Sequence, residues 1–150
     1  MSDEKEIIFM KEAIKQANLA AKIGEVPVGA VICLNDEIIA AAHNQRETSQ
    51  NATAHAEILA INIACEKLES WRLNECDLYV TLEPCPMCSG AIINSRIKNV
   101  FFGAYDPKAG CMGSVININN IPFNHHANIK GGILQDECSA MLKNFFLRLR

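Results

Sequence analysis

The sequence lacks the features that mark secreted, membrane-spanning and repetitive proteins. Its apolar runs are all too short to cross a bilayer, and the opening segment MSDEKEIIFM is acidic, without the basic-then-apolar order of a signal peptide. It has neither an internal repeat nor a low-complexity tract. We therefore expect a cytoplasmic globular protein whose 150 residues form a single domain, 1–150.

A surplus of basic residues, the usual mark of a nucleic-acid-binding domain, is also missing. The formal net charge is −3 and the pI is about 5.8. This average hides an asymmetry. Residues 1–95 hold seven Lys and Arg against fourteen Asp and Glu, whereas residues 96–150 hold seven against three. The C-terminal third is therefore able to form a basic face.

Cysteine, in contrast, is plentiful. The seven cysteines are an odd number, so they cannot all pair, and a reducing compartment argues against a disulfide framework. Cys33, Cys65 and Cys138 fall on apolar faces and are predicted to fill the core, whereas Cys111 lies in a loop where we expect it to be exposed. The remaining pair of interest is Cys85 and Cys88, in the segment EPCPMCSG.

Hydrophobic periodicity predicts strands that alternate with helices after an opening hairpin. We expect helices over 4–23, 86–95 and 136–149. A further helix is expected to be capped by Thr53 and to carry Ile58, Leu59, Ile63 and Leu68 along one side. The expected strands cover 28–34, 38–44, 77–82, 99–105 and 128–134, and the polar segment 45–53 is expected to be a loop. This order is typical of a layered α/β domain with a partly parallel sheet.

The Cys85–Cys88 pair fits three kinds of site. Positions three apart share one face of a helix, and the N-terminus of a helix favours thiolates, which suits metal binding and redox chemistry alike. A structural zinc site would call for a second Cys-x-x-Cys, which the sequence does not contain. His55, thirty residues earlier, would complete a set of three ligands with one open position, the pattern of catalytic zinc.

Glu57 follows His55 by two residues in the segment TAHAEILA. Residues two apart on a regular helix diverge by roughly 200°, so both side chains can reach one centre only from the start of the helix. A glutamate there is either a general acid and base or a solvated residue that complements the helix dipole. We expect the former because of the neighbouring His55 and the two thiols.

These motifs resemble a known family. His-Ala-Glu followed by Pro-Cys-x-x-Cys is similar to the signature of the zinc-dependent cytidine and deoxycytidylate deaminase superfamily. The segments EVPVGAVI, LYVTLEPCPMCSGAIINSRI and VFFGAYDPKAGCMGS further resemble the bacterial tRNA adenosine deaminases, which convert the wobble adenosine to inosine. The resemblance covers nearly the whole chain and is loose only in the first twenty or so residues and at 115–128.

The resemblance implies a three-layer α/β/α domain, with a central five-stranded mixed sheet opened by an antiparallel hairpin and helices on both faces. It implies one Zn²⁺ per chain held by His55, Cys85 and Cys88, catalysis by Glu57, tRNA as the substrate, and a homodimer. It further implies that Asn44 and the backbone N–H of Ala56 contact the target nucleoside, and that Asp106 and Lys108 contact the flanking nucleotides.

The last helix carries Phe145 and Phe146 beside Lys143 and Arg148, a combination able to grip splayed bases and backbone. We expect at least one of the two phenylalanines to be buried, and we interpret His125 and His126 as loop residues.

Three alternative functions remain open. The chain could deaminate a free guanine- or cytosine-type nucleobase or nucleoside, could be a zinc-stabilised RNA-binding module without turnover, or could be a thiol-disulfide protein.

Overall fold

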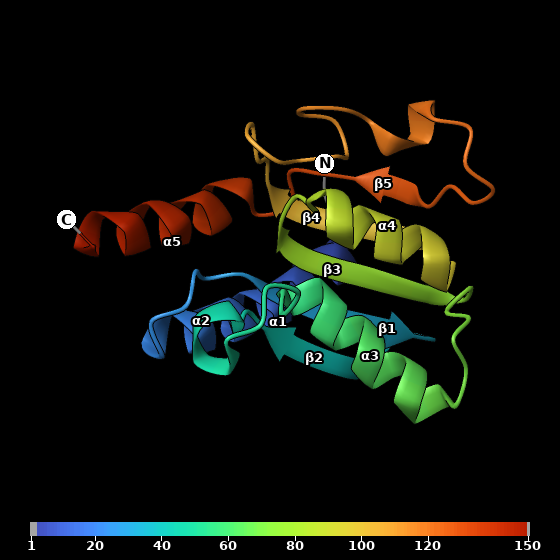
Figure 1. Cartoon of the computed structure of the whole chain (residues 1–150), viewed down its shortest axis with the longest axis horizontal. Helices are drawn as coiled ribbons and strands as arrows, with labels where there is room; N and C mark the ends of the chain where they lie inside the picture. The colour runs from blue at the N-terminus through green and yellow to red at the C-terminus, as the bar shows by residue number, and fades with distance from the viewer. Residues whose placement is uncertain (1–2, 150) are drawn as a thin grey trace.

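The computed structural model describes residues 3–149 and contains a five-stranded mixed sheet between two layers of helices (Figure 1). The strands follow the order β2-β1-β3-β4-β5; β1 is antiparallel to β2 and β3, while β3, β4 and β5 are parallel. Their bounds are β1 Gly29–Leu34, β2 Glu37–His43, β3 Cys76–Leu82, β4 Asn99–Ala104 and β5 Asn128–Lys130. The predicted three-layer α/β/α class is confirmed.

The opening hairpin forms where the sequence predicts it. Asn35 and Asp36 adopt φ angles of 51° and 64°, the left-handed conformation that a two-residue hairpin turn needs and that Asn and Asp tolerate. The hairpin places β2 at one edge of the sheet and β1 next to the central strand β3.

The first helix, α1 Glu4–Lys22, covers one face of the sheet together with α5 Gln135–Arg148. A capping box fixes the start of α1: Asp3 Oδ1 accepts a hydrogen bond from the N–H of Glu6 at 2.8 Å, and Glu6 Oε1 accepts from the N–H of Asp3 at 3.1 Å. Gly24 follows the helix with a φ of 81°, so it ends α1 as predicted.

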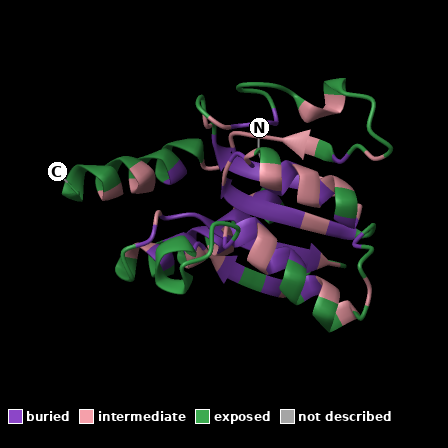
Figure 2. Ribbon diagram, viewed as in Figure 1, coloured by how far each residue is buried: buried purple, intermediate pink, exposed green. Residues whose placement is uncertain are grey.

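The other face is covered by α3 Ala56–Leu68 and α4 Pro86–Ser95, which lie side by side in front of the sheet (Figure 1). Successive residues of the inner strands alternate between the two layers, and β1, β3 and β4 are mostly buried, whereas the edge strands β2 and β5 are partly exposed (Figure 2). Ala56, Ala60 and Ala64 of α3 are fully buried, which lets this helix approach the sheet closely.

The predicted apolar stripe of α3 is only partly buried. Ile58, Leu59 and Leu68 are half-buried, with Leu59 and Leu68 packed against the core, and Ile63 is 42% exposed, because the alanines face the sheet. Thr53 is not the cap of this helix, since His55 occupies that position.

Segments 45–53 and 128–134 also differ from the prediction. The first contains a short helix, α2 Arg46–Ser49, because Glu25 accepts hydrogen bonds from the backbone N–H groups of Glu47 and Thr48. The last strand ends at Lys130, and Gly132, with a φ of 86°, turns the chain towards α5. A short 3₁₀ turn, η1 Ile118–Asn120, lies within the long connection between β4 and β5.

Most of α5 is exposed (Figure 2), and Cys138 is its buried residue. The expectation that Phe145 or Phe146 is buried is wrong: Phe145 is half-buried and Phe146 is 49% exposed, because the C-terminal part of α5 projects past the sheet (Figure 1). Within residues 3–149 the helices are all too short or too polar to cross a membrane.

Candidate active site

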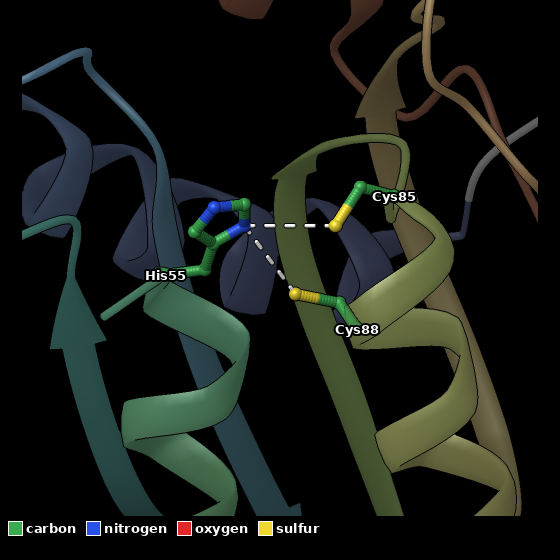
Figure 3. A group of neighbouring side chains, drawn as sticks. All are labelled: His55, Cys85 and Cys88. Carbon is green, nitrogen blue, oxygen red and sulfur yellow. Dashed lines mark hydrogen bonds between the residues drawn. The ribbon is translucent and has the colours of Figure 1, made fainter. Parts of the chain in front are cut away.

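The starts of α3 and α4 bring His55, Cys85 and Cys88 together beside the carboxyl end of β3 (Figure 3). His55 Nδ1 lies 3.6 Å from the Sγ atoms of both cysteines, and the three ligand atoms lie within 4.8 Å of one another. Among residues 3–149 this is the one group of three or more His, Cys, Asp or Glu side chains arranged to hold a metal ion. The predicted proximity of these residues, which stand thirty or more positions apart in the sequence, is confirmed.

Two of the three residues stand immediately before a helix. His55 is the N-cap of α3, with extended backbone angles of −78° and 150°, and Cys85 is the N-cap of α4, with angles of −76° and 177°. Pro86 then starts α4, where its missing N–H costs no hydrogen bond. On a regular helix, the side chains of residues 55 and 57 would point in different directions. Because His55 precedes the helix, this constraint does not apply to its side chain.

The two thiols respond differently to this environment. The hydrogen bond from Cys88, together with the hydrogen bond to His55, lowers the pKa of Cys85 to about 4 despite burial. The hydrogen bond to Cys85 and burial raise the pKa of Cys88. The Cys85 hydrogen bond likewise raises the pKa of His55. The surroundings therefore favour the thiolate form of Cys85. An imidazole with two cysteine sulfurs is a donor set that Zn²⁺ accepts.

Glu57 lies in the first turn of α3 and is 4% exposed. Burial raises the pKa of its carboxyl group to about 7. A carboxyl group with such a pKa is able both to take up and to release a proton near neutral pH, which suits a general acid and base.

His55, Glu57 and Cys85 line a hollow of about 210 Å³. Its apolar wall consists of Val26, Val28 and Leu82, and its polar lining also includes Asn44, Arg46, Glu83 and Asp106. A wider groove of about 490 Å³ shares Val26, Arg46, Leu82 and Asp106 with it and continues along Tyr105, Pro107, Lys108, Leu142 and Phe146. The hollow therefore opens towards the exposed face of α5.

Asn44 follows β2 and is 6% exposed. Its Oδ1 accepts a hydrogen bond from the N–H of Ala56 at 3.2 Å, which ties the end of the hairpin to the start of α3. The contact between the Ala56 N–H and a nucleoside stays a prediction. It requires the N–H to release the oxygen of Asn44 and to donate to the nucleoside instead.

Asp106 and Lys108 lie in the loop after β4. Asp106 Oδ1 accepts hydrogen bonds from the N–H groups of Lys108 and Ala109, so the side chain shapes the turn as well as facing the hollow. Lys108 is exposed and lines the groove. Their contacts with nucleotides stay predictions.

Three charged residues of the site have no predicted role in the sequence. Arg46 borders the hollow and the groove, Glu25 holds the short helix that carries Arg46, and Glu83 bonds the loop after β4. For Glu25 and Glu83 burial alone would raise the pKa, but the hydrogen bonds they accept outweigh it and hold each pKa below its usual value. For Glu83, the sequence offers one hint of a role near the site: this residue stands directly before Pro84 and Cys85.

The other cysteines and histidines lie mostly as expected. Cys33 and Cys138 are buried, whereas Cys65 is half-buried. The predicted exposure of Cys111 is wrong: it is 2% exposed, because its N–H donates to the carbonyl of Pro84 and draws it under the loop. His125 and His126 are hydrogen-bonded to the backbone carbonyls of Ile97 and Ile121, as loop-stabilising residues would be.

The model of the MafB19-like deaminase family matches residues 3–150, and the class of protein is therefore a deaminase. A buried glutamate beside a His-Cys-Cys cluster, at the starts of two helices of a three-layer fold, is compatible with this class. The curated tRNA-specific adenosine deaminase of Bacillus subtilis (strain 168) is 55% identical over 144 residues, covering 95% of this chain and 89% of the relative. The chain thus belongs to the family of tRNA-specific adenosine deaminases.

Solved structures agree with this placement. One from biochemical and structural studies of A-to-I editing by tRNA:A34 deaminases at the wobble position matches with a TM-score of 0.88 and 40% identity, over 90% of this chain and 99% of that one. A guanine deaminase from Nitrosomonas europaea has a TM-score of 0.76 at 22% identity, over 97% of this chain and 85% of that one, which shows a shared fold.

Proposed function

We propose that this chain deaminates adenosine to inosine by hydrolysis at the wobble position of a tRNA anticodon loop, and that residues 1–150 act as one domain. The observation that carries this proposal is the buried Glu57 beside His55, Cys85 and Cys88 at one hollow. The substrate class is supported by the relative from Bacillus subtilis and by the structure from the wobble-editing studies.

His55, Cys85 and Cys88 would hold one Zn²⁺ per chain. When bound, the ion lowers the pKa of water from about 15.7 towards about 7, which makes a nucleophile available at neutral pH. Glu57 would take a proton from the attacking water and pass it to the purine ring nitrogen beside the carbon that bears the amino group. It would then carry the proton of the newly attached hydroxyl group to the amino group, which leaves as ammonia, so that a carbonyl oxygen replaces the amino group at that carbon.

The walls of the hollow hold the base. Val26, Val28 and Leu82 offer apolar contacts to the faces of the purine and exclude bulk water. Because Asn44 Oδ1 accepts from Ala56, the NH₂ group of the same amide is the donor that would bind the purine or ribose. A base from a single-stranded loop suits such a pocket, since extruding it costs only a few kcal/mol.

The groove outside the hollow fits the neighbouring nucleotides. Tyr105 and Phe146 are 45% and 49% exposed and present flat surfaces for bases, and Lys108 supplies a cation for phosphate. Most residues of this groove belong to the C-terminal third, where the basic residues outnumber the acidic ones. Asp106, at the boundary between the hollow and the groove, would meet a nucleotide next to the target.

We further propose that the protein works as a homodimer in the cytoplasm, where its tRNA substrate is found. Large apolar side chains remain exposed on α3 and on the connection between β4 and β5: Ile63 by 42%, Val115 by 54%, Ile116 by 42% and Phe123 by 47%. Exposed apolar side chains that gather in one patch typically mark an interface, and we propose that these do. Sedimentation equilibrium should give twice the chain mass; a monomer would refute this part of the proposal.

The decisive experiment offers the purified protein an anticodon stem-loop with adenosine at the wobble position, with free adenosine, guanine and cytosine in parallel reactions. Inosine in the stem-loop alone is the expected result. Turnover of a free base with an unchanged stem-loop would support the nucleobase deaminase instead. Failure to retain zinc, together with a reversible Cys85–Cys88 disulfide, would support the thiol-disulfide alternative, and retained zinc without turnover would support an RNA-binding module.

A further inference from the structure

A single buried carboxylate lies beneath the loop of residues 105–114, which carries Asp106 and Lys108. Glu83 is 2% exposed, and both of its oxygens accept hydrogen bonds from this loop. Oε1 accepts from the N–H of Asp106 at 2.9 Å and from the hydroxyl of Ser114, and Oε2 accepts from the N–H groups of Met112 at 2.9 Å and Ser114 at 3.0 Å.

This carboxylate accepts most of the hydrogen bonds that join the loop to the connection between β3 and α4. Within the described residues, one further hydrogen bond joins the loop to the connection between β3 and α4, from the N–H of Cys111 to the carbonyl of Pro84. Gly110 packs directly on the carboxylate, and a Cβ atom there would overlap the carboxyl group of Glu83. The loop and the carboxylate are therefore in direct contact.

We propose that Glu83 is a positioning residue that sets the loop for nucleotide binding, an inference that rests on the proposed function. Its four partners are all donors, so its oxygens are engaged by the loop and do not take part in proton transfer. Asp106 is bonded through its own N–H and lies between the hollow and the groove. Loss of the carboxylate would thus displace Asp106 and Lys108 while leaving His55, Cys85 and Cys88 in place.

The test is Glu83→Gln, which keeps the shape of the side chain but sets an NH₂ group against two of the loop donors. With the stem-loop substrate we expect KM to rise roughly 10- to 100-fold, because a displaced loop loses its binding contacts with the flanking nucleotides, while kcat and zinc content stay close to wild type. The matched control is Glu6→Gln, a 6% exposed carboxylate that pairs with Lys130 Nζ at 2.7 Å between α1 and β5. This control should leave KM unchanged.

A second readout follows the loop without any substrate. Lys108 is exposed and is a trypsin site, so the rate of cleavage after it reports how firmly the loop is held. Glu83→Gln should be cut faster after Lys108 than both wild type and Glu6→Gln. Ser114→Ala, which removes one of the four donors, should show a smaller change in the same direction, and it serves if Glu83→Gln does not fold.

The outcomes separate the two proposals. Loss of zinc or of kcat with an unchanged KM would place Glu83 in the metal site or the chemistry and overturn the inference, as would unchanged cleavage after Lys108. If the wild-type protein leaves the stem-loop unmodified, the proposed function fails. The cleavage rates then still decide whether Glu83 holds the loop.

Discussion

Replacing Glu57 by Gln tests the proposed chemistry most directly. The amide has nearly the same shape as the carboxyl group, so the first turn of α3 keeps its packing at this 4% exposed position. It cannot carry a proton from water to the purine. Because ionising a buried carboxylate costs free energy, a neutral amide should not destabilise the apoprotein.

The expected loss can be estimated from the role assigned to Glu57. General acid–base catalysis contributes roughly 100- to 10,000-fold, which corresponds to about 3–5 kcal/mol of transition-state free energy. Glu57 moves the proton both to the ring nitrogen and to the leaving amine, so we expect kcat to fall towards the upper end of this range. KM should change little, since the walls of the hollow and Asn44 hold the base.

The assay measures inosine formed in the wobble stem-loop under single-turnover conditions, with metal analysis and thermal unfolding of the same preparation. Zinc content and melting temperature should match wild type, which separates catalysis from metal binding and folding. If Glu57→Gln keeps its zinc and turns over within about tenfold of wild type, Glu57 is not the proton carrier.

Three further perturbations test the metal site, a buried carboxylate and the glycines. Cys85→Ser should abolish zinc retention and deamination. The control Cys65→Ser should keep both, because Cys65 lies at the end of α3 away from His55. Equal zinc contents of the two variants by metal analysis would exclude the ligand role of Cys85. Glu25→Gln should lower the unfolding free energy at pH 7 by roughly 1–3 kcal/mol through lost hydrogen bonds to α2. Because the folded pKa of Glu25 is lowered from 4.5, this contribution is complete above the unfolded pKa and disappears as pH falls through the folded pKa, so denaturation of mutant and wild type should converge in acid; a gap that widens there would contradict the reasoning. Gly110→Ala should destabilise the protein by overlap with the carboxylate beneath it, whereas Gly90→Ala, in helix α4 with open space around it, should stabilise it by about 0.5–1 kcal/mol; melting curves of equal shift would refute the packing argument.

Local sequence determined much of the fold because its signals act over short distances. Asn35-Asp36 specifies a tight hairpin turn, Gly24 ends α1, and Pro86 starts α4, each through the backbone angles that these residues allow. Which residues of α3 face the sheet does not follow from the sequence, because size and hydrophobicity favour Ile63, whereas a close approach to the sheet requires the small side chains of Ala60 and Ala64. Only packing against strands distant in sequence decides between them.

The candidate site shows the same division. Residue types and spacing were enough to single out His55, Glu57, Cys85 and Cys88, because few chemistries use an imidazole, a carboxylate and two thiols in this pattern. The sequence did not show that His55 stands before its helix, which is what lets it and Glu57 line one hollow. Nor did it reveal Glu25 or Glu83: each is a glutamate among many until the chain folds and brings backbone N–H groups from more than twenty residues away to its oxygens. Hydrogen bonds over such separations exist only in the tertiary structure, so the structure alone assigned these two carboxylates to the loops that border the site.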